Sequence, residues 1–247
     1  MDFKKNDNIV LVIGKTEGHL EQTIFAREVL SEKKGPPPEI NLFNEKNNGL
    51  TISKLIKDNL IESCHDVSLG GILIAIAKMC IKGNKGIKIN DCLKKILSNP
   101  NISGKKWVWE QYDHTVMGDT IQKPGGNSGV VRVHGTQKAI AATIDSSATY
   151  CYAHPNTGGK QTVCESWRNL ISVGASPIAI TNCLNFGNPE KEKNMGEFVE
   201  CVEGMSEASK YLNFPVVSGN VSFYNETKDK GIKPTPTIGG VGLIKNY

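Results

Sequence analysis

No apolar stretch in the 247 residues is long enough to cross a membrane, and like charges never gather into blocks of five or six. A membrane-spanning helix needs about 20 consecutive apolar residues, and the first residues also lack the apolar core of a secretory signal. The formal charge of +4 is spread thinly along the chain, whereas a dedicated nucleic-acid surface concentrates its lysines and arginines. We therefore expect a cytoplasmic protein that binds neither membranes nor nucleic acids.

The seven cysteines are odd in number and include no CxxC pair. Most of them lie inside apolar runs, which favours buried, reduced thiols over disulfides or metal ligands. The apolar fraction of 38% supplies enough hydrophobic side chains for one large domain or two small ones.

Residues 1–91 predict a helix-rich unit that begins with a strand. Apolar spacing indicates a strand at 8–13 and helices at 21–30, 51–60 and 72–80. Ser68 is the expected N-cap of the last helix, because a serine hydroxyl can accept a hydrogen bond from a backbone N–H of the first turn. The pattern changes near residue 90, so we expect a domain boundary between residues 91 and 92.

Residues 92–247 alternate strands with long amphipathic helices. Strands are expected at 106–111, 129–134, 138–145, 176–184, 216–220 and 237–244, and helices pass through 163–171 and 195–212. Gly174 and Pro215 mark the ends of the two helices. This alternation is typical of an α/β layered domain, here a mixed sheet covered by helices.

Two histidine-containing motifs are candidates for chemistry, and each has a structural alternative. His65, Asp66 and Ser68 precede a predicted helix, whose N-terminus favours a carboxylate or phosphate, but the same residues can simply cap that helix. His154 and Lys160 flank two glycines that could bring backbone N–H groups to an anion. The loop could equally be tight for packing reasons, and one histidine in a loop does not define a catalytic base.

Polar side chains follow two predicted core strands. Asn182 lies near the end of one strand, and Gly219, Asn220 and Ser222 end the other. Ligands of open α/β sheets gather outside the carboxyl ends of the strands. Gly219 would let a nucleotide approach the backbone, Asn220 would offer a carbonyl oxygen to Mg²⁺, and Ser222 would offer a hydroxyl to a substrate. Asparagine and glycine are also ordinary turn residues, so the residues alone leave both interpretations open.

Longer motifs resemble a known family. The runs WVWEQYDHTVMGDTIQKPGGNSGVVRVHGT, ESWRNLISVGASPIAITNCLNFGNPE and PVVSGNVSFYNET closely resemble the second synthetase-type domain of the phosphoribosylformylglycinamidine synthase large-subunit family, which is related to aminoimidazole ribonucleotide synthase. The earlier run NLIESCHDVSLGGILIAIAKM resembles the front of the domain that follows it in that family. The resemblance implies a synthase N-terminal-type domain at 92–247 and part of the companion C-terminal-type α/β sandwich domain at 1–91.

The resemblance also implies an ATP-dependent C–N ligase of purine biosynthesis. In this family ATP phosphorylates the amide oxygen of formylglycinamide ribonucleotide, and glutamine-derived ammonia then displaces the phosphate, so positioning and charge neutralisation carry much of the rate. Matched to the family motif SGNVS, Gly219 would contact ATP, Asn220 would bind Mg²⁺ and Ser222 would contact the substrate. Asn182 would be a further ATP contact. The implied partners are a glutaminase subunit with a small accessory subunit, or a fused glutaminase domain, and a like domain or second copy that pairs with the sheet.

The chain departs from the family pattern in several respects. Asn182 replaces the aspartate of the family motif TDCLNFGNP, which removes a charged acceptor, and Leu69 replaces an acidic residue at a helix start. The two domains occur in reversed order. The chain does not contain the family's first half, with its ESHNHP motif and catalytic histidine, so no residue is assigned as catalytic and His154 is not given that role. Two rival hypotheses are a non-catalytic nucleotide-binding or scaffold module of the same fold, and a small-molecule-binding protein unrelated to purines.

Overall fold

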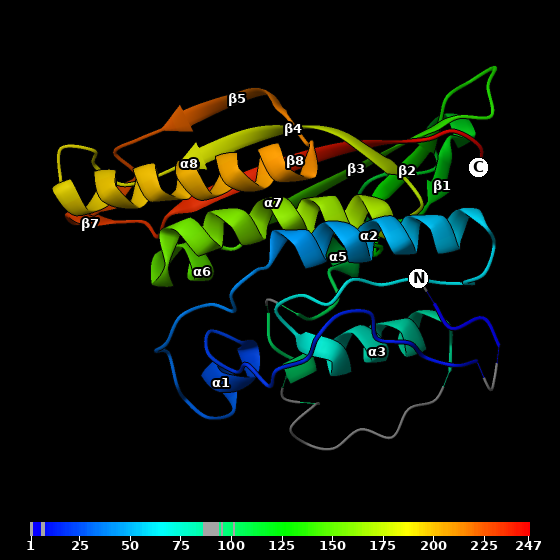
Figure 1. Ribbon diagram of the computed structural model, residues 1–247, viewed down its shortest axis with the longest axis horizontal. Coiled ribbons are helices and arrows are strands. Elements are labelled where there is room, and N and C mark those ends of the chain that lie inside the picture. The colour runs from blue at the N-terminus through cyan, green and yellow to red at the C-terminus, as the bar shows by residue number, and fades with distance from the viewer. Residues whose placement is uncertain (1, 6–7, 86–93, 95, 101) are drawn as a thin grey trace.

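The computed structural model describes residues 2–5, 8–85, 94, 96–100 and 102–247. Its centre is a six-stranded sheet with the strand order β1-β2-β3-β8-β4-β5 (Figure 1). The strands are β1 (Thr120–Gln122), β2 (Gly129–Arg132), β3 (Ala139–Ser146), β4 (Ser176–Asn185), β5 (Val216–Ser222) and β8 (Thr235–Ile244), and β6 (Glu226–Thr227) pairs with β7 (Lys230–Gly231) in a separate hairpin. β4 and β5 run parallel and the other neighbours run antiparallel. The predicted mixed sheet is therefore confirmed.

Two long helices, α7 (Pro155–Ser172) and α8 (Glu192–Leu212), pack against each other and share one hydrophobic core with the sheet. α2 (Leu42–Lys57) packs on α7, and Figure 1 places α1 (Ile24–Glu28) and α3 (Gly71–Lys82) beyond α2, farther from the sheet. The shorter elements are α5 (Lys106–Trp109), the 3₁₀ turn η1 (Val116–Gly118) and α6 (Ala148–Ala153). The layers confirm the α/β fold class predicted from the sequence.

The opposite face of the sheet is open in the described part of the chain. Successive side chains of a strand point to opposite faces. In β3, Ala141 and Thr143 are buried on the helix side, whereas Ile140 is exposed and Ile144 is 79% exposed on the other side. Val241 of β8 is exposed on that same side. The helices therefore cover one face only, and apolar side chains of the second face lack a packing partner.

Two glycines bring α7 and α8 into close contact. A Cβ atom added to Gly204 of α8 would lie 2.0 Å from the carbonyl oxygen of Asn156, and one added to Gly159 of α7 would lie 2.4 Å from that of Cys201. No side chain fits where two helix backbones approach this closely. Gly159, one of the two glycines before Lys160, thus has a packing role inside α7. This agrees with the structural interpretation of these glycines rather than with anion binding.

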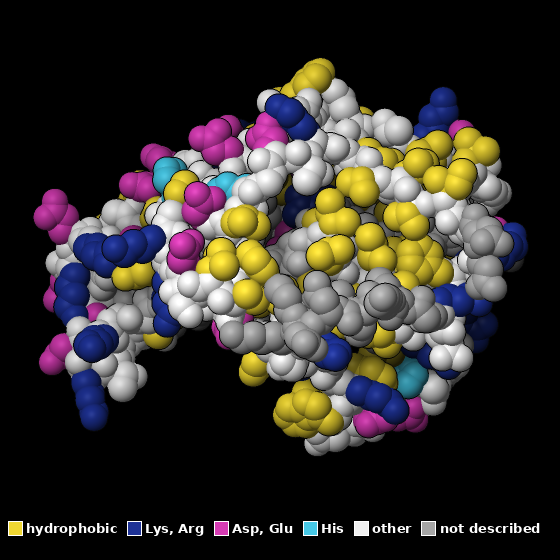
Figure 2. All heavy atoms as spheres, turned by 90° about the horizontal axis from the view of Figure 1, so that it is seen from below, with side chains coloured by type: hydrophobic (Ala, Val, Ile, Leu, Met, Phe, Trp, Pro, Cys, Tyr) yellow, Lys and Arg dark blue, Asp and Glu magenta, His cyan; other side chains and the backbone are white. Residues whose placement is uncertain are grey.

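The side of the molecule formed by α1 and α3 carries exposed apolar side chains. α3 is apolar apart from Lys78 and Lys82, and its Leu73 and Ile81 are both exposed. Figure 2 views the molecule from this side and shows hydrophobic side chains gathered over the middle of it. A helix of this composition is normally buried, so within the described residues α3 lacks part of its usual packing partner.

The structure confirms the periodic elements of the second unit. The helices through 163–171 and 195–212 and the strands at 129–134, 138–145, 176–184, 216–220 and 237–244 are all present, with ends shifted by a few residues. Gly174, the expected end signal of the first helix, has φ +84° just after α7. α8 ends earlier than Pro215, because Asn213 adopts the left-handed conformation that terminates the helix. The expected boundary between residues 91 and 92 lies outside the described residues.

Four predictions about local structure are wrong. Residues 8–13 form no strand, and Ile9 and Leu11 are exposed, because none of the described strands supplies the hydrogen-bonding partner that a strand needs. The segment at 106–111 contains the short helix α5, where the i,i+4 ion pair of Lys106 with Glu110, the C-cap residue, favours helix over strand.

The other two errors concern helix starts. α2 begins at Leu42 rather than near residue 51, because the Asn41 side chain accepts a hydrogen bond from Asn44 N at 3.0 Å and caps the helix there. Ser68 does not cap α3. Its carbonyl oxygen accepts from Gly71 N, and Gly70 is the N-cap residue.

The glycine contact between α7 and α8 predicts the effect of one added methyl group. Gly204→Ala is expected to lower the free energy of unfolding by about 2 to 3 kcal/mol, because the new Cβ overlaps Asn156 O. Urea unfolding followed by circular dichroism measures the change. Gly196→Ala is the matched control on the same helix: nothing lies within 4 Å of its added Cβ, so it should raise stability by up to about 1 kcal/mol. Equal effects of the two substitutions would contradict a specific role of close packing at Gly204.

Candidate functional site

The four residues predicted to form a ligand site lie side by side on β4 and β5. In the parallel register Asn182 pairs with Gly219, Cys183 with Asn220 and Asn185 with Ser222. The two strands end together, as expected for the carboxyl edge of a parallel pair. Gly219 and Asn220 are both exposed on β5, which is an edge strand of the sheet. The polar strand end is therefore open to a ligand and is not sealed in the core.

The four side chains do not all point to the same face. Asn182 pairs with Ile238 of β8, which is fully buried on the helix side. Alternation along the strands therefore directs Asn182 toward the helices, and directs Asn220 and Ser222 toward the open face. A ligand that contacts all of them must extend around the exposed backbone of β5.

The structure gives a packing reason for a glycine at position 219, which the sequence did not reveal. A Cβ atom at this position would lie 1.9 Å from Oδ1 of Asn182, so any larger residue would displace the neighbouring amide. Close approach of a side chain therefore explains the glycine without a nucleotide. A contact between Gly219 and ATP stays a prediction.

The hydrogen bonds at the strand ends hold Ser222 and leave Asn220 available. Asn225 Nδ2 donates to Ser222 O at 2.9 Å, to Phe186 O at 3.0 Å and to Ser222 Oγ at 3.3 Å, which ties the end of β5 to the end of β4. Within the described residues, the structure gives no hydrogen bond to the Asn220 side chain. One step earlier, Thr181 Oγ1 and Ser218 Oγ lie 2.9 Å apart on the same face. The open side of β5 thus presents an unpaired amide between hydroxyl groups.

The strand-end corner formed by Asn220 and Ser222 could hold Mg²⁺ only if phosphate oxygens of a ligand supplied part of its coordination shell. Within the described residues no group of three or more His, Cys, Asp or Glu side chains could hold a metal ion. Mg²⁺ commonly takes one or two protein ligands and completes its shell with water and substrate phosphates. The amide oxygen of Asn220 can serve as one such ligand.

His154 and Lys160 have structural roles. The ring Nδ1 of His154, the N-cap of α7, accepts from Thr157 N at 3.4 Å. Lys160 Nζ lies 2.6 Å from Glu207 Oε2 and links α7 to α8. Both contacts stabilise the helices that carry these residues.

The HDVS motif lines a second candidate site that the sequence only half identified. His65, Asp66 and Ser68 border a cleft of about 760 Å³ together with the glycine-rich loop at 123–129 and side chains of β3 and α7. His65 Nδ1 lies 3.3 Å from Asp66 Oδ1. In the described part of the chain, Asp66 Oδ2 and Asn169 Oδ1 are buried without a hydrogen-bond partner, so the cleft is rich in oxygen atoms that a ligand or water could satisfy.

Two carboxyl groups in this cleft have strongly shifted pKa values. Burial raises the pKa of Asp145 to about 6, although Thr143 Oγ1 and Asn169 Nδ2 donate to its carboxyl group at 2.9 and 2.7 Å. Burial raises the pKa of Glu165 to about 7, and the nearby Asp145 and Asp66 add to the shift. The sequence offered one signal: Glu165 and Asn169 are four residues apart and share a helix face. Nothing in the sequence placed Asp145 beside them.

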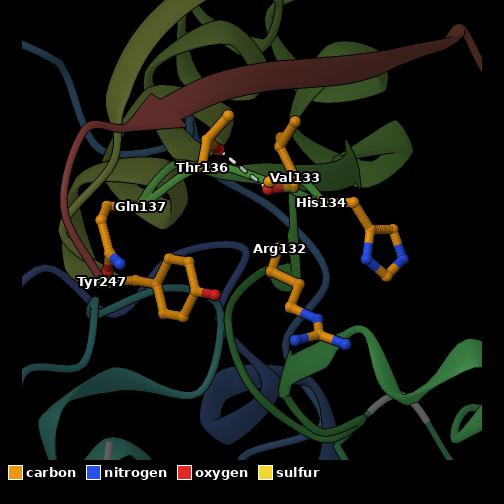
Figure 3. A pocket seen from close by; sticks show the side chains of 7 residues that line it. Arg132, Val133, His134, Thr136, Gln137 and Tyr247 are labelled. Carbon is orange, nitrogen blue, oxygen red and sulfur yellow. Dashed lines mark hydrogen bonds between the residues drawn. The ribbon is translucent and has the colours of Figure 1, made fainter.

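Figure 3 shows a shallow third pocket of about 470 Å³ between the β2–β3 turn and Tyr247. Its polar groups are largely satisfied within the chain. Arg132 Nε and His134 Nε2 each lie 2.9 Å from the Asp119 carboxylate, and the Arg132 hydrogen bond is the main cause that lowers the pKa of Asp119. In Figure 1 this turn lies at the opposite end of the sheet from the ends of β4 and β5. The pocket is therefore separate from both candidate sites.

Family models match most of the chain in two parts. Residues 125–244 match AIR synthase related protein, N-terminal domain, and residues 5–108 match AIR synthase related protein, C-terminal domain. The chain therefore belongs to the AIR synthase related proteins. The C-terminal-type match precedes the N-terminal-type match, which is the order expected from the motifs.

Within this class the chain is similar to PurL. It is 77% identical over 163 residues to phosphoribosylformylglycinamidine synthase subunit PurL of Pelagibacter ubique, which covers 66% of this chain and 22% of the relative. The structure of PurLQS from Thermotoga maritima superposes with a TM-score of 0.55 at 34% identity, over 58% of this chain and 24% of that chain. T. maritima PurL complexed with ATP and with FGAR gives a TM-score of 0.52 in both cases, at 33% and 34% identity, over 57% of this chain and 23% of each of those chains. The chain thus spans about a fifth of the length of the curated relative.

The shifted pKa of Glu165 predicts a pH dependence of stability. A carboxyl group whose pKa is higher in the folded state favours folding below its unfolded value, and this contribution is lost as pH rises from about 4.5 to about 7. Glu165→Gln should therefore match the parent at pH 4 and exceed its unfolding free energy at pH 8 by on the order of 2 kcal/mol. Urea unfolding at the two pH values measures the difference. The exposed Glu203→Gln on α8 is the control, and a gain at pH 8 that it shares would refute a specific role of Glu165.

Proposed function

We propose that the chain is part of a phosphoribosylformylglycinamidine synthase, contributing one wall of the site in which ATP drives conversion of formylglycinamide ribonucleotide to the amidine. The observation that carries this proposal is the exposed end of β5, where an unpaired Asn220 follows Gly219 in a sequence segment that matches the synthase motif. The likeness to T. maritima PurL, solved in complex with ATP and with FGAR, supports it over the matched part of the chain. Such an enzyme is an ATP-dependent C–N ligase, and we expect it in the cytoplasm. No helix among the described residues is both long and apolar enough to span a bilayer.

The residues at the strand ends have distinct proposed roles. Backbone groups of Gly219 contact ATP along the exposed edge of β5, and the amide of Asn182 contacts it from the helix side. Asn220 is the protein ligand of Mg²⁺, which neutralises charge on the phosphates when it is bound. Ser222, whose hydroxyl is held by Asn225, orients the ribonucleotide through a hydrogen bond. These groups position reactants, and none of them is a catalytic base.

The matched segment covers 22% of the PurL relative, and we expect turnover to need further parts of such an enzyme. The proposed reaction consumes ammonia released from glutamine, so a glutaminase subunit with a small accessory subunit, or a fused glutaminase domain, is the proposed source. The T. maritima relative has been solved in an assembly named PurLQS. The open apolar face of the sheet also suits pairing with a like domain or with a second copy, because exposed apolar patches mark interaction surfaces. The site would then be shared between two domains.

One observation favours a rival. Asn182 supplies an amide where the family motif has a charged acceptor, which is compatible with a non-catalytic nucleotide-binding module of the same fold. Calorimetry can separate the synthase proposal from this non-catalytic module, because only the synthase proposal requires Asn220 for nucleotide binding.

Calorimetric titration with Mg-ATP tests the proposed site. The chain is expected to bind Mg-ATP, and Asn220→Ala is expected to weaken binding by about tenfold or more, since a ligand to a charged group is lost. Val217→Ala on the same exposed strand is the control and should leave affinity unchanged. Binding that ignores Asn220 would support the non-catalytic module, and a failure to bind nucleotide would reject both in favour of an unrelated ligand.

A turnover assay tests the need for the remaining half. With formylglycinamide ribonucleotide and ammonia, the chain alone should release no ADP above background, because it lacks the half that holds the family's catalytic histidine. Addition of a complete PurL that is inactivated in its own SGNVS motif should show whether this chain can complement it. ADP release from the chain alone would show that the missing half is dispensable.

A further inference from the structure

Basic side chains from three separate segments gather around Tyr152 of α6, whose side chain is half exposed. Lys193 Nζ, from the first turn of α8, lies 5.2 Å from the centre of the Tyr152 ring, and Lys233 Nζ, from the segment before β8, lies 5.8 Å from it. Arg27 of α1 reaches the same helix, where its Nη1 donates to Thr149 Oγ1 at 3.1 Å. Segments far apart in the sequence therefore bring positive charges to one aromatic ring.

These positive charges are poorly balanced. In the described part of the chain, Lys33 and Lys233 have no carboxylate within ion-pair distance, and Lys193 has only Glu197 at 3.7 Å. Burial, and then the nearby charges of Arg27 and Lys33, lower the pKa of Lys233. Like charges held close together repel each other. The fold thus maintains an unfavourable interaction that a bound anion would relieve.

The basic cluster borders the edge of the sheet where β4 and β5 end. Thr235, two residues after Lys233, pairs with Asn185 at the end of β4, and Asn185 pairs with Ser222 at the end of β5. The cluster is therefore next to the strand-end corner, but it consists of different residues from different elements. A ligand bound at the Tyr152 cluster would therefore lie close to a ligand bound at the ends of β4 and β5.

We infer that Tyr152, Lys193, Lys233 and Arg27 form a subsite for a phosphate group. Lysine ammonium groups act as point charges toward phosphate, and arginine adds a planar donor fork. The Tyr152 ring attracts both ammonium groups through its face, and its hydroxyl can donate a hydrogen bond. The phosphate can belong to a polyphosphate tail or to a sugar phosphate, since both carry the same anionic group. The alternative is that the two lysines only pack against the Tyr152 ring. In that case the cluster would show no saturable binding of an anion.

Binding of two simple probes tests this subsite without ATP. The whole chain is titrated at low salt with inorganic pyrophosphate and, separately, with ribose 5-phosphate, and binding is followed by calorimetry. At least one probe should bind saturably, and the tighter of the two identifies the source of the phosphate. Lys233→Gln and Lys193→Gln should each weaken that binding by about tenfold. Lys230→Gln, a nearby exposed lysine outside the cluster, should change it by less than about twofold.

The ε-ammonium pKa of Lys233, followed by NMR, provides a second readout and should rise when the probe saturates the chain, because a bound anion favours the charged form. Absence of binding by both probes, or equal weakening by Lys230→Gln, would overturn the inference. The result is independent of the proposed ATP site. Asn220→Ala should leave pyrophosphate and ribose 5-phosphate binding intact, so failure of one proposal can be told from failure of the other.

Discussion

The packing of α7 and α8 against one face of the sheet determines which face of the sheet stays exposed. Gly159 and Gly204 let the two helix backbones touch, and Gly240 lets α7 approach β8, where an added Cβ would lie 2.3 Å from Ser166 Oγ. These close contacts leave no room for a larger residue, and the core built around them includes buried side chains such as Leu170. This packing occupies much of the helix side of the sheet, so the opposite face is the more open of the two to a ligand or a partner.

Strand alternation then gives the two faces different chemistry. The helix side of β3 places Asp145 in the acidic cleft, where burial raises its pKa to about 6, and the open side of β5 presents Asn220 and Ser222. Asn182 belongs to the helix side, so a nucleotide can contact both Asn182 and Asn220 only around an edge strand. β5 is such a strand. Its position at the edge is what makes the proposed site geometrically consistent, and a central strand with the same sequence would not allow it.

The sequence predicted those elements whose structure depends on their own periodicity. The apolar stripes of α7 and α8 and the alternation of β3 and β4 identified all four. It failed at 8–13, which has the composition of a strand but no neighbour to pair with, and at 106–111, where residues 106–109 form a short helix. The same division holds at the sites. Motif and strand order brought Asn182 to Gly219, but neither the faces of the sheet nor the approach of Asp145 to Glu165 follows from local sequence, because the register and the helix packing decide them.

Two of the features left without partners lie near the ends of β4 and β5. The open apolar face includes Asn220, and the unbalanced cluster around Tyr152 borders the ends of the same strands. A like domain that covered the apolar face would also enclose Asn220 and remove water from its surroundings. Electrostatic interactions strengthen when water is excluded, so this closure would strengthen the interaction of the Asn220 amide with a bound ligand. Domain pairing and ligand binding at the end of β5 would then favour each other, since pairing also buries apolar side chains that the isolated chain exposes.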